Sequence, residues 1–340
     1  MNLVERLTEL TQIPGPSGAE RPIAEQLRAR FAPYMDRVYI DNMGNVIGEK
    51  LSGKPNAKRV LLEAHMDEIG LVVTGSREGY LSFVALGNVD AQLLPGMRLR
   101  LLSNPPRTGL VSCLPPHVLS REEMEKPIAI SDLVLNCGLT EQEAEEIVPG
   151  TPIVFDVEPV LLAENCFSSK ALDNRASFAV LLGVLAQFTP AEIDLVVLAS
   201  TQEELGVRGA IPALFGTAPD LCICLDVAFA KTPDTDWPLH LGRGTVITRG
   251  PVFNRALSDR LTAIAKAQGI AHQFEVIAGR SNTTADVAQI SRHGVPTALL
   301  SIPLRYMHSP VEMINLSDVE AEIALLTAFL QEMQEVTVRV

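Results

Sequence analysis

The sequence predicts a layered α/β domain with an inserted β-rich, barrel-like domain. Four short runs are almost wholly apolar, as expected of parallel strands buried on both faces of a sheet. Helical patterns lie between these runs, and such alternation is typical of α/β domains. From Ile69 to Asn165, short strands and turns rich in Gly and Pro replace the alternation, as in a small barrel or sandwich. The four apolar runs are 59–64, 194–200, 220–226 and 297–302.

This change of pattern divides the chain of 340 residues into two domains. Residues 1–68 and 166–340 are expected to form the α/β domain, and residues 69–165 the inserted domain. A chain of this length suggests about two domains in any case. An insertion of this kind leaves both of its ends close together on the surface of the host domain.

Helical spacing of apolar residues predicts the main helices. The segment 172–188 carries Phe178 and Leu181 on one face, and the segment 254–269 ends at Gly269, a typical helix stop. The segment 316–334 closes the chain, with Ser317 expected to cap its N-terminus. The first twelve residues form an amphipathic helix, and 140–148 is a short helix candidate inside the inserted domain. The helices expected in the α/β domain supply the layers that cover its sheet.

Composition excludes several classes of protein. Hydrophobic residues make up 47% of the chain, which is enough for a large core and excludes an intrinsically disordered chain. The formal net charge is −13 and no basic cluster stands out, so neither nucleic acid nor an anionic membrane is an expected partner. The N-terminal helix is not a signal peptide, and no apolar run approaches the ~18 residues that a membrane span requires.

The five cysteines are scattered and odd in number. Cys222 and Cys224 lie in one apolar run, where both side chains would face the same side of a strand. No CxxC pair indicates a structural zinc site, so buried thiols in a reducing compartment are expected. The predicted location is therefore the cytoplasm.

Histidines and carboxylates follow each of the four apolar runs. One acid after a strand is usually a loop or cap residue, and one such histidine is usually a hydrogen-bonded core residue. Four strands that all end in this way indicate a site, because ligands of open α/β sheets bind at the carboxyl ends of the strands. A further acid, Asp173, precedes a long helix and is either its N-cap or part of the site. The residues after the strands are His65, Asp67 and Glu68; Glu203 and Glu204; Asp226; and His308.

The residue types in this set favour a metal centre. A cation offsets the mutual repulsion of several carboxylates and keeps them ionised. Histidine with carboxylate suits zinc, cobalt or manganese, and tells against iron–sulfur or copper–thiolate chemistry. Two metals bridged by a carboxylate need about five protein ligands. Competing signatures are missing: the sequence has no GxSxG, HExxH or P-loop, and the glycines at 242–250 lack GxGxxG spacing.

Several motifs together resemble those of the tetrahedral (glutamyl/deblocking) aminopeptidase family of dinuclear metallopeptidases, some of whose members carry the name endoglucanase or cellulase. The resemblance runs nearly end to end. It includes "IPGPSGAE", "DNMGNVIGE", "KALDNRASFAVLL" and "LDVA" in the family's order and spacing. The most specific segments are "HMDEIG", "EELGVRGA" and "RYMHSP".

This resemblance implies a layered α/β metallopeptidase domain that holds two divalent metal ions, with zinc or cobalt expected and manganese as an alternative. His65 and Asp226 would bind the first metal, and Glu204 and His308 the second. Asp173 would bridge both metals. In related enzymes the peptide bond after this aspartate can be cis.

The resemblance also implies the catalytic residues. Glu203 would be the general base that takes a proton from the attacking water. Asp67 would orient the imidazole of His65. The implied activity is removal of N-terminal amino acids from peptides with a free N-terminus. Two alternatives remain open: a deacylase of N-acyl amino acids that uses the same metals, and a non-catalytic peptide-binding shell.

Two further expectations follow from the resemblance. The inserted domain would form a homodimer, and dimers would assemble into a hollow tetrahedral dodecamer. The sequence also departs from the family's pattern, because members usually carry "GGTDA" where this chain has "SNTTA" at 281–285. Thr284 thus stands where an acid is expected, which concerns the substrate pocket, and the nearby Arg280 is a candidate partner for an acidic substrate side chain.

Overall fold

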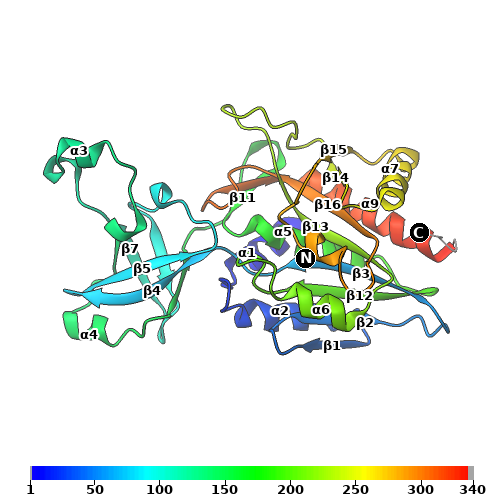
Figure 1. Cartoon of the computed structure of the whole chain (residues 1–340), viewed down its shortest axis with the longest axis horizontal. Helices are drawn as coiled ribbons and strands as arrows, with labels where there is room; N and C mark the ends of the chain where they lie inside the picture. Colours follow the sequence, from blue (N-terminus) through cyan, green and yellow to red (C-terminus); the bar gives the residue numbers. More distant parts are fainter. Residues whose placement is uncertain (1, 336–340) are drawn as a thin grey trace.

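The computed structural model describes residues 2–335 and contains a mixed α/β domain with a separate barrel projecting from one end (Figure 1). The α/β domain is built on an eight-stranded sheet in the order β1-β2-β12-β3-β13-β16-β14-β15. The four central strands are the four predicted apolar runs, and they are mutually parallel. The strands are β1 (Arg37–Ile40), β2 (Val46–Lys50), β12 (Ile193–Ser200), β3 (Lys58–His65), β13 (Leu221–Phe229), β16 (Thr297–Leu304), β14 (Thr245–Arg249) and β15 (His272–Val276).

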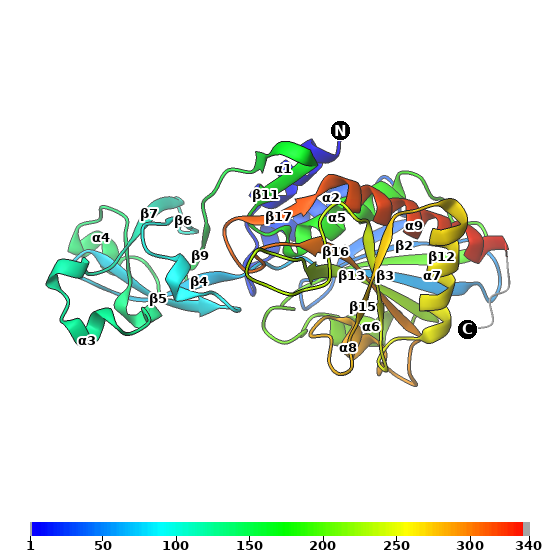
Figure 2. The same cartoon turned by 90° about the horizontal axis from the view of Figure 1, so that it is seen from above.

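Helices cover both faces of this sheet (Figure 2). The helices α1, α2, α5, α7 and α9 share one apolar cluster with the strands, and α6 and α8 share another on the opposite face. The parallel strands are buried on both faces because helical layers pack against each side of the sheet. The helices are α1 (Leu3–Gln12), α2 (Arg21–Phe31), α5 (Leu172–Leu185), α7 (Arg255–Gln268), α9 (Leu316–Glu335), α6 (Ala210–Thr217) and α8 (Ala285–Ala288).

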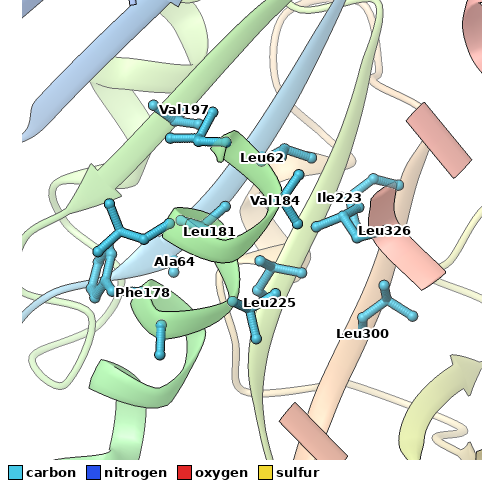
Figure 3. Packing of buried hydrophobic residues seen from close by; sticks show 14 of the residues in the cluster. Leu62, Ala64, Phe178, Leu181, Val184, Val197, Ile223, Leu225, Leu300 and Leu326 are labelled. Atoms are coloured by element: carbon cyan, nitrogen blue, oxygen red, sulfur yellow. The ribbon is translucent and has the colours of Figure 1, made fainter. Parts of the chain in front are cut away.

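Helix α5 lies at the centre of the larger cluster, and all of its residues are buried. Its apolar side chains, such as Phe178 and Leu181, pack against Leu62, Ala64 and Val197 of the sheet (Figure 3). A helix that is apolar on every side belongs in the interior of a domain. The helix begins with Ala171 in the left-handed region, and the Asp173–Asn174 peptide bond is cis.

The second part is a closed six-stranded barrel in the order β4-β5-β8-β7-β6-β9. Closure removes the exposed edges that an open sheet would present. The barrel has its own apolar cluster, so the predicted fold class is confirmed. The elements of this part are β4 (Gly70–Arg77), β5 (Tyr80–Leu86), β6 (Arg98–Leu101), β7 (Arg107–Ser112), α3 (Arg121–Met124), β8 (Val134–Asn136), α4 (Glu141–Glu145) and β9 (Pro152–Phe155).

A three-stranded sheet connects the end of the barrel segment with the α/β domain. Its strands are β10 (Val160–Leu161), β11 (Cys166–Ser169) and β17 (Glu312–Asn315), and all pairs are antiparallel. β11 leads directly into α5, and β17 into α9. This small sheet therefore places the start of α5 beside the segment that follows β16.

Two helix ends test the expectations about caps. Gly269 ends α7 with φ 68°, so the predicted stop is confirmed. The predicted cap at Ser317 is wrong, because α9 begins at Leu316 and the Asn315 side chain accepts from both the backbone N–H and the hydroxyl of Ser317. Among residues 2–335, no helix combines the length and hydropathy that crossing a bilayer requires.

Candidate metal centre and active site

The residues that follow the four central strands converge at one edge of the sheet. His65 is the last residue of β3, Asp226 lies in the last part of β13, and the Glu203–Glu204 pair follows β12. His308 follows β16, while Asp173 comes from the first turn of α5. All six line one cavity of about 560 Å³. The structure thus brings together His65, Asp173, Glu203, Glu204, Asp226 and His308, with Asp67 directly behind His65.

Two groups of ligand candidates overlap at Asp173, and a third group consists of His65, Glu203 and Glu204. His65 Nε2 lies 3.0 Å from Asp173 Oδ1 and 3.8 Å from Asp226 Oδ1. His308 Nε2 lies 3.3 Å from Asp173 Oδ2 and 3.1 Å from Glu204 Oε1. In each group the donor atoms lie within 4.8 Å of one another, close enough to hold one metal ion. Asp173 belongs to the first two groups and offers a different oxygen to each histidine.

The donor atoms fit a pair of cations electrostatically. Within residues 2–335, none of the six cavity residues forms an ion pair with a lysine or arginine. Burial raises the pKa of Glu203 to about 9 and that of Asp226 to about 8, and neighbouring carboxylates add to both shifts. A bound cation would favour the ionised carboxylates and so reverse the direction of these shifts. The set of imidazole and carboxylate donors suits zinc, cobalt or manganese.

The carboxylate of Glu312 was missed by the sequence interpretation. It is buried, and it accepts hydrogen bonds from the backbone N–H groups of Asp173 (3.0 Å) and His308 (2.9 Å). One side chain therefore holds two candidate ligands from distant parts of the chain. The available signal was its position four residues after His308, within the segment that resembles the family.

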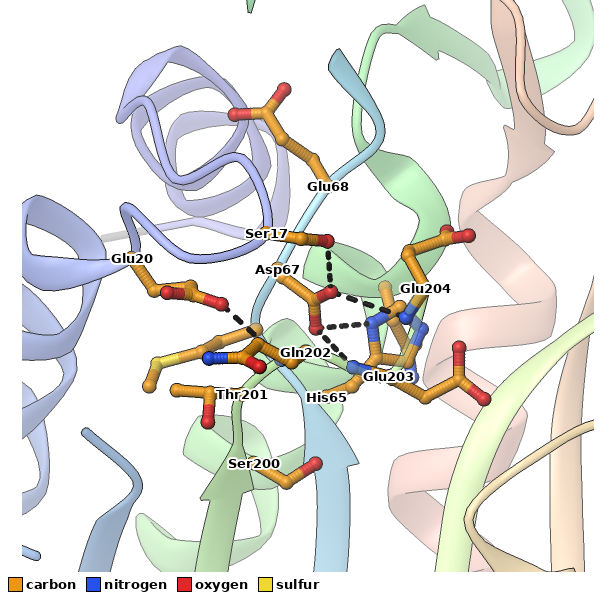
Figure 4. Close-up of polar contacts among 12 residues, drawn as sticks. Ser17, Glu20, His65, Asp67, Glu68, Ser200, Thr201, Gln202, Glu203 and Glu204 are labelled. Atoms are coloured by element: carbon orange, nitrogen blue, oxygen red, sulfur yellow. Dashed lines mark hydrogen bonds and ion pairs between the residues drawn. The ribbon is translucent and has the colours of Figure 1, made fainter. Parts of the chain in front are cut away.

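Asp67 is fully buried and accepts three hydrogen bonds (Figure 4). The donors are the backbone N–H groups of Glu203 (3.0 Å) and Glu204 (3.2 Å) and the hydroxyl of Ser17 (2.6 Å). Asp67 Oδ1 also lies 3.5 Å from Nδ1 of His65. The two adjacent glutamates are thus held by their backbone, which leaves both side chains directed into the cavity.

The chain matches a known protein family over most of its length. The model of the M42 glutamyl aminopeptidases matches residues 44–325. The chain belongs to this family of aminopeptidases. It is 35% identical to the lysyl aminopeptidase of Pyrococcus furiosus over 97% of both chains. It is 30% identical to the glutamyl aminopeptidase of Lactococcus lactis over 94% of this chain and 93% of that protein.

Solved structures of family members have the same overall architecture. An aminopeptidase from Desulfurococcus kamchatkensis superposes with a TM-score of 0.91 at 29% identity, covering 99% of this chain and 98% of that one. The TET1 peptidase of Pyrococcus horikoshii, described as assembling into a tetrahedron or a large octahedral shell, has a TM-score of 0.84 at 30% identity, with 97% and 99% covered. The predicted resemblance to the family is confirmed, including its endoglucanase-like names, one of which belongs to a Thermotoga maritima structure.

The departure at Thr284 has a structural explanation in this chain. Thr284 is buried and donates a hydrogen bond to Glu63 Oε1 at 3.0 Å, as does Ser200 at 2.7 Å. Burial raises the pKa of Glu63 to about 7. An acid at position 284 would therefore meet a second buried carboxylate, whereas a threonine supplies a donor. Asp286 accepts hydrogen bonds from Ser281, and so it serves the adjacent loop.

Proposed function

We propose that the protein is an aminopeptidase that uses two divalent metal ions. The observation that carries this proposal is Asp173, which contributes one oxygen to each of two histidine–carboxylate groups. His65 and Asp226 would hold the first ion, and Glu204 and His308 the second, with Asp173 between them. Zinc or cobalt suits these donors best, and manganese is an alternative.

Bound there, the ions would supply a water of lowered pKa and polarise the scissile carbonyl group. Glu203 is then the general base: its side chain lines the cavity and forms no ion pair among the described residues. It takes the proton of the attacking water and delivers it to the leaving amine. Asp67 keeps the imidazole of His65 in place and holds the backbone on which Glu203 stands.

The expected substrates are peptides with a free N-terminus. Their α-ammonium group would lie against the carboxylates of the cavity, which form no ion pair with a lysine or arginine among residues 2–335. A cavity of about 560 Å³ accommodates one side chain and the first peptide bond. Binding of the free α-ammonium group by these carboxylates would restrict cleavage to the first residue of the substrate.

We also propose that residues 69–165 form a dimer contact and that dimers assemble into a dodecamer. The support comes from the TET peptidases, which have this architecture and are described as tetrahedral or dodecameric assemblies. Apolar side chains of the barrel part, such as Leu110 and Leu114, are more than half exposed in the single chain. Light scattering is expected to give a particle far larger than 36.8 kDa. A stable, active monomer would contradict the assembly.

The experiment that tests the activity compares two kinds of chromogenic substrate. Metal-free protein is assayed with aminoacyl and N-acyl amino acid substrates, each with added zinc or cobalt. Metal-dependent release from the aminoacyl substrates alone supports the proposal. Preference for the N-acyl substrates indicates a deacylase, and metal binding with no turnover of either kind indicates a non-catalytic peptide-binding shell.

A further inference from the structure

The segment Gly15–Glu20 is linked to the loop that carries Glu203 and Glu204 through Asp67 and through the backbone N–H of Gln202. This segment is part of the stretch "IPGPSGAE", one of those that carry the family resemblance, and it precedes the matched family model, which begins at residue 44. It is tied to Glu68 by a parallel β-bridge at Pro16 and by hydrogen bonds in both directions, Glu68 N to Gly15 O (3.0 Å) and Ser17 N to Glu68 O (3.3 Å). The N-terminal segment is thus fixed to the end of the strand that carries His65.

Ser17 makes the first of these links, through Asp67. Its hydroxyl donates to Asp67 Oδ2 at 2.6 Å, and both groups are buried. The same oxygen accepts the backbone N–H of Glu204, while Oδ1 accepts that of Glu203 (Figure 4). A carboxylate that accepts several hydrogen bonds has one favoured orientation, and a hydrogen bond to a charged group is stronger than one between neutral groups. Ser17 therefore fixes the orientation in which Asp67 receives both backbone N–H groups.

Glu20 makes the second link, directly to Gln202, the residue before Glu203. Its Oε1 accepts the backbone N–H of Gln202 at 3.2 Å and that of Gly18 at 2.8 Å. Gln202 has φ 54°, a left-handed conformation that costs a residue other than Gly roughly 1 kcal/mol. This turn directs the chain from β12 into the cavity just before Glu203. The hydrogen bond from Gln202 to Glu20 helps to hold that unfavourable conformation.

The base of this loop, at Thr201 and Gly209, is fixed separately by Asn45. Asn45 Oδ1 accepts the backbone N–H of Thr201 (2.9 Å), and Asn45 Nδ2 donates to Gly209 O (2.9 Å). The base of the loop is thus closed without help from the N-terminal segment. Ser17 and Glu20 instead hold its tip, where Gln202, Glu203 and Glu204 stand.

We infer that Ser17 and Glu20 are positioning residues for the hydrolytic reaction. Ser17 acts through Asp67 and Glu20 acts through Gln202, and together they hold the backbone of the general base. The inference rests on the proposed function for its kinetic consequences, but its structural part concerns only the residues of this chain. Loss of either contact removes no candidate metal ligand, but it loosens the backbone of the loop and allows the Glu203 side chain to move away from the water that it deprotonates.

The kinetic test uses two variants, each with a conservative partner. Ser17→Ala and Glu20→Ala are expected to lower kcat roughly 10- to 100-fold, the usual effect of removing a group that orients an active-site residue. KM should change little, because an interaction needed mainly in the transition state is lost. Both variants should still bind metal, because no candidate ligand is removed. Ser17→Thr retains a hydroxyl and Glu20→Gln retains an acceptor oxygen, so both should restore most of kcat.

Matched controls exclude a general loss of stability. Ser177 is buried, as Ser17 is, and its hydroxyl has no hydrogen-bond partner among residues 2–335, so Ser177→Ala should leave kcat unchanged. Glu25 lies on α2 in a partly exposed ion pair with Arg21, so Glu25→Gln should also be silent. Equal losses of kcat in the controls and the variants would overturn the inference.

Hydrogen exchange in the metal-free protein tests the same inference without any turnover. Exchange of the backbone amides in a peptide covering 201–209 should be faster in Ser17→Ala and Glu20→Ala, while a peptide covering β13 keeps the wild-type rate. Unchanged exchange at 201–209, or an unchanged kcat in an active enzyme, overturns the inference and leaves the proposed function standing. Absence of any metal-dependent peptidase activity in the wild type refutes the proposed function, and the exchange result still decides the positioning role.

Discussion

Two buried clusters of charged residues lie side by side in the α/β domain, and they satisfy their carboxylates in different ways. The metal-ligand cluster consists of His65, Asp173, Glu204, Asp226 and His308. The Glu68 cluster consists of Glu68, Lys170 and Arg175. The two clusters share two segments, because His65 and Glu68 lie at and just after the end of β3, and Lys170, Asp173 and Arg175 lie around the start of α5.

The Glu68 cluster contains its own cations. Lys170 Nζ lies 2.6 Å from Glu68 Oε2, and Arg175 Nη2 lies 3.6 Å from Glu68 Oε1. Arg175 also donates to the carbonyl groups of Leu10, Ile13 and Met66. Burial lowers the pKa of Lys170, and the adjacent carboxylate opposes that shift. The cluster thus joins the N-terminal helix to the sheet without any bound ligand.

The metal-ligand cluster has carboxylates but no lysine or arginine in ion-pair contact within residues 2–335. Its histidines are the only basic groups that pair with its acids there. Burial alone would lower the pKa of His308, but the hydrogen bonds that its ring donates to Asp173 and Glu204 raise the pKa to about 11. The comparison teaches that buried acids indicate a ligand site only where the chain supplies no cation to neutralise them.

The largest expected effect separates the two adjacent glutamates of the loop. Glu203→Ala leaves every candidate ligand in place, so two metals should still bind while turnover falls at least roughly 10²–10⁴-fold. Excess metal should not restore activity. Glu204→Ala removes a donor from the second metal, which should bind more weakly, with partial recovery in excess metal. Metal analysis beside a metal-titrated peptidase assay checks both, and weak metal binding by Glu203→Ala alone would reverse the assignment.

The next prediction concerns the Glu68 cluster. Lys170→Met leaves the buried Glu68 carboxylate with only the more distant arginine, and should lower the free energy of unfolding by about 3–5 kcal/mol. Added metal should not compensate, because the metal ligands are intact. Chemical denaturation measures the loss. Lys54 is exposed in a surface ion pair, so Lys54→Met is the control and should change stability little.

Only part of these two clusters could be predicted from the sequence alone. The four apolar runs predicted the parallel strands, and the residues after them predicted the cavity, because strand ends are local features of the sequence. The contacts of Glu312, Ser17 and Lys170 could not be predicted in this way. Each depends on side chains brought together from distant segments, and the pattern around each residue is that of an ordinary polar loop or strand.

A smaller effect on stability, which depends on pH, is expected at Glu322. This buried acid pairs with no lysine or arginine among residues 2–335 and belongs to no group of candidate metal ligands. Glu322 is fully buried, its Oε2 accepts from Thr245 at 2.7 Å, and its Oε1 has no partner among residues 2–335. Burial raises its pKa to about 8, and the nearby Asp226 and Asp318 add to the shift. The native state therefore holds a proton that the unfolded state has lost above its ordinary pKa near 4.5.

The stability provided by the neutral form is complete below pH 4.5 and is lost as the pH rises through 8. Wild-type Tm should consequently fall relative to that of Glu322→Gln between pH 5 and pH 8, by about 1–2 °C for each kcal/mol in a chain of 340 residues. Thermal unfolding of both metal-free proteins across this range measures the difference. A gap that does not change with pH would mean that Glu322 ionises in the native protein.

The smallest expected effect concerns the rim of the metal cavity, where a cation is present but unpaired. Arg280 lines the cavity, is exposed, and forms no ion pair within the described residues. A substrate with an acidic first residue would supply its partner, at ~1 kcal/mol for an exposed pair. Arg280→Ala should therefore lower the ratio of glutamyl to leucyl turnover about fivefold. Arg121→Ala in the barrel, also exposed, should leave the ratio unchanged. An unchanged ratio after Arg280→Ala would contradict this prediction. Glu275 lines the same cavity, and its carboxylate would then favour substrates with a basic first residue.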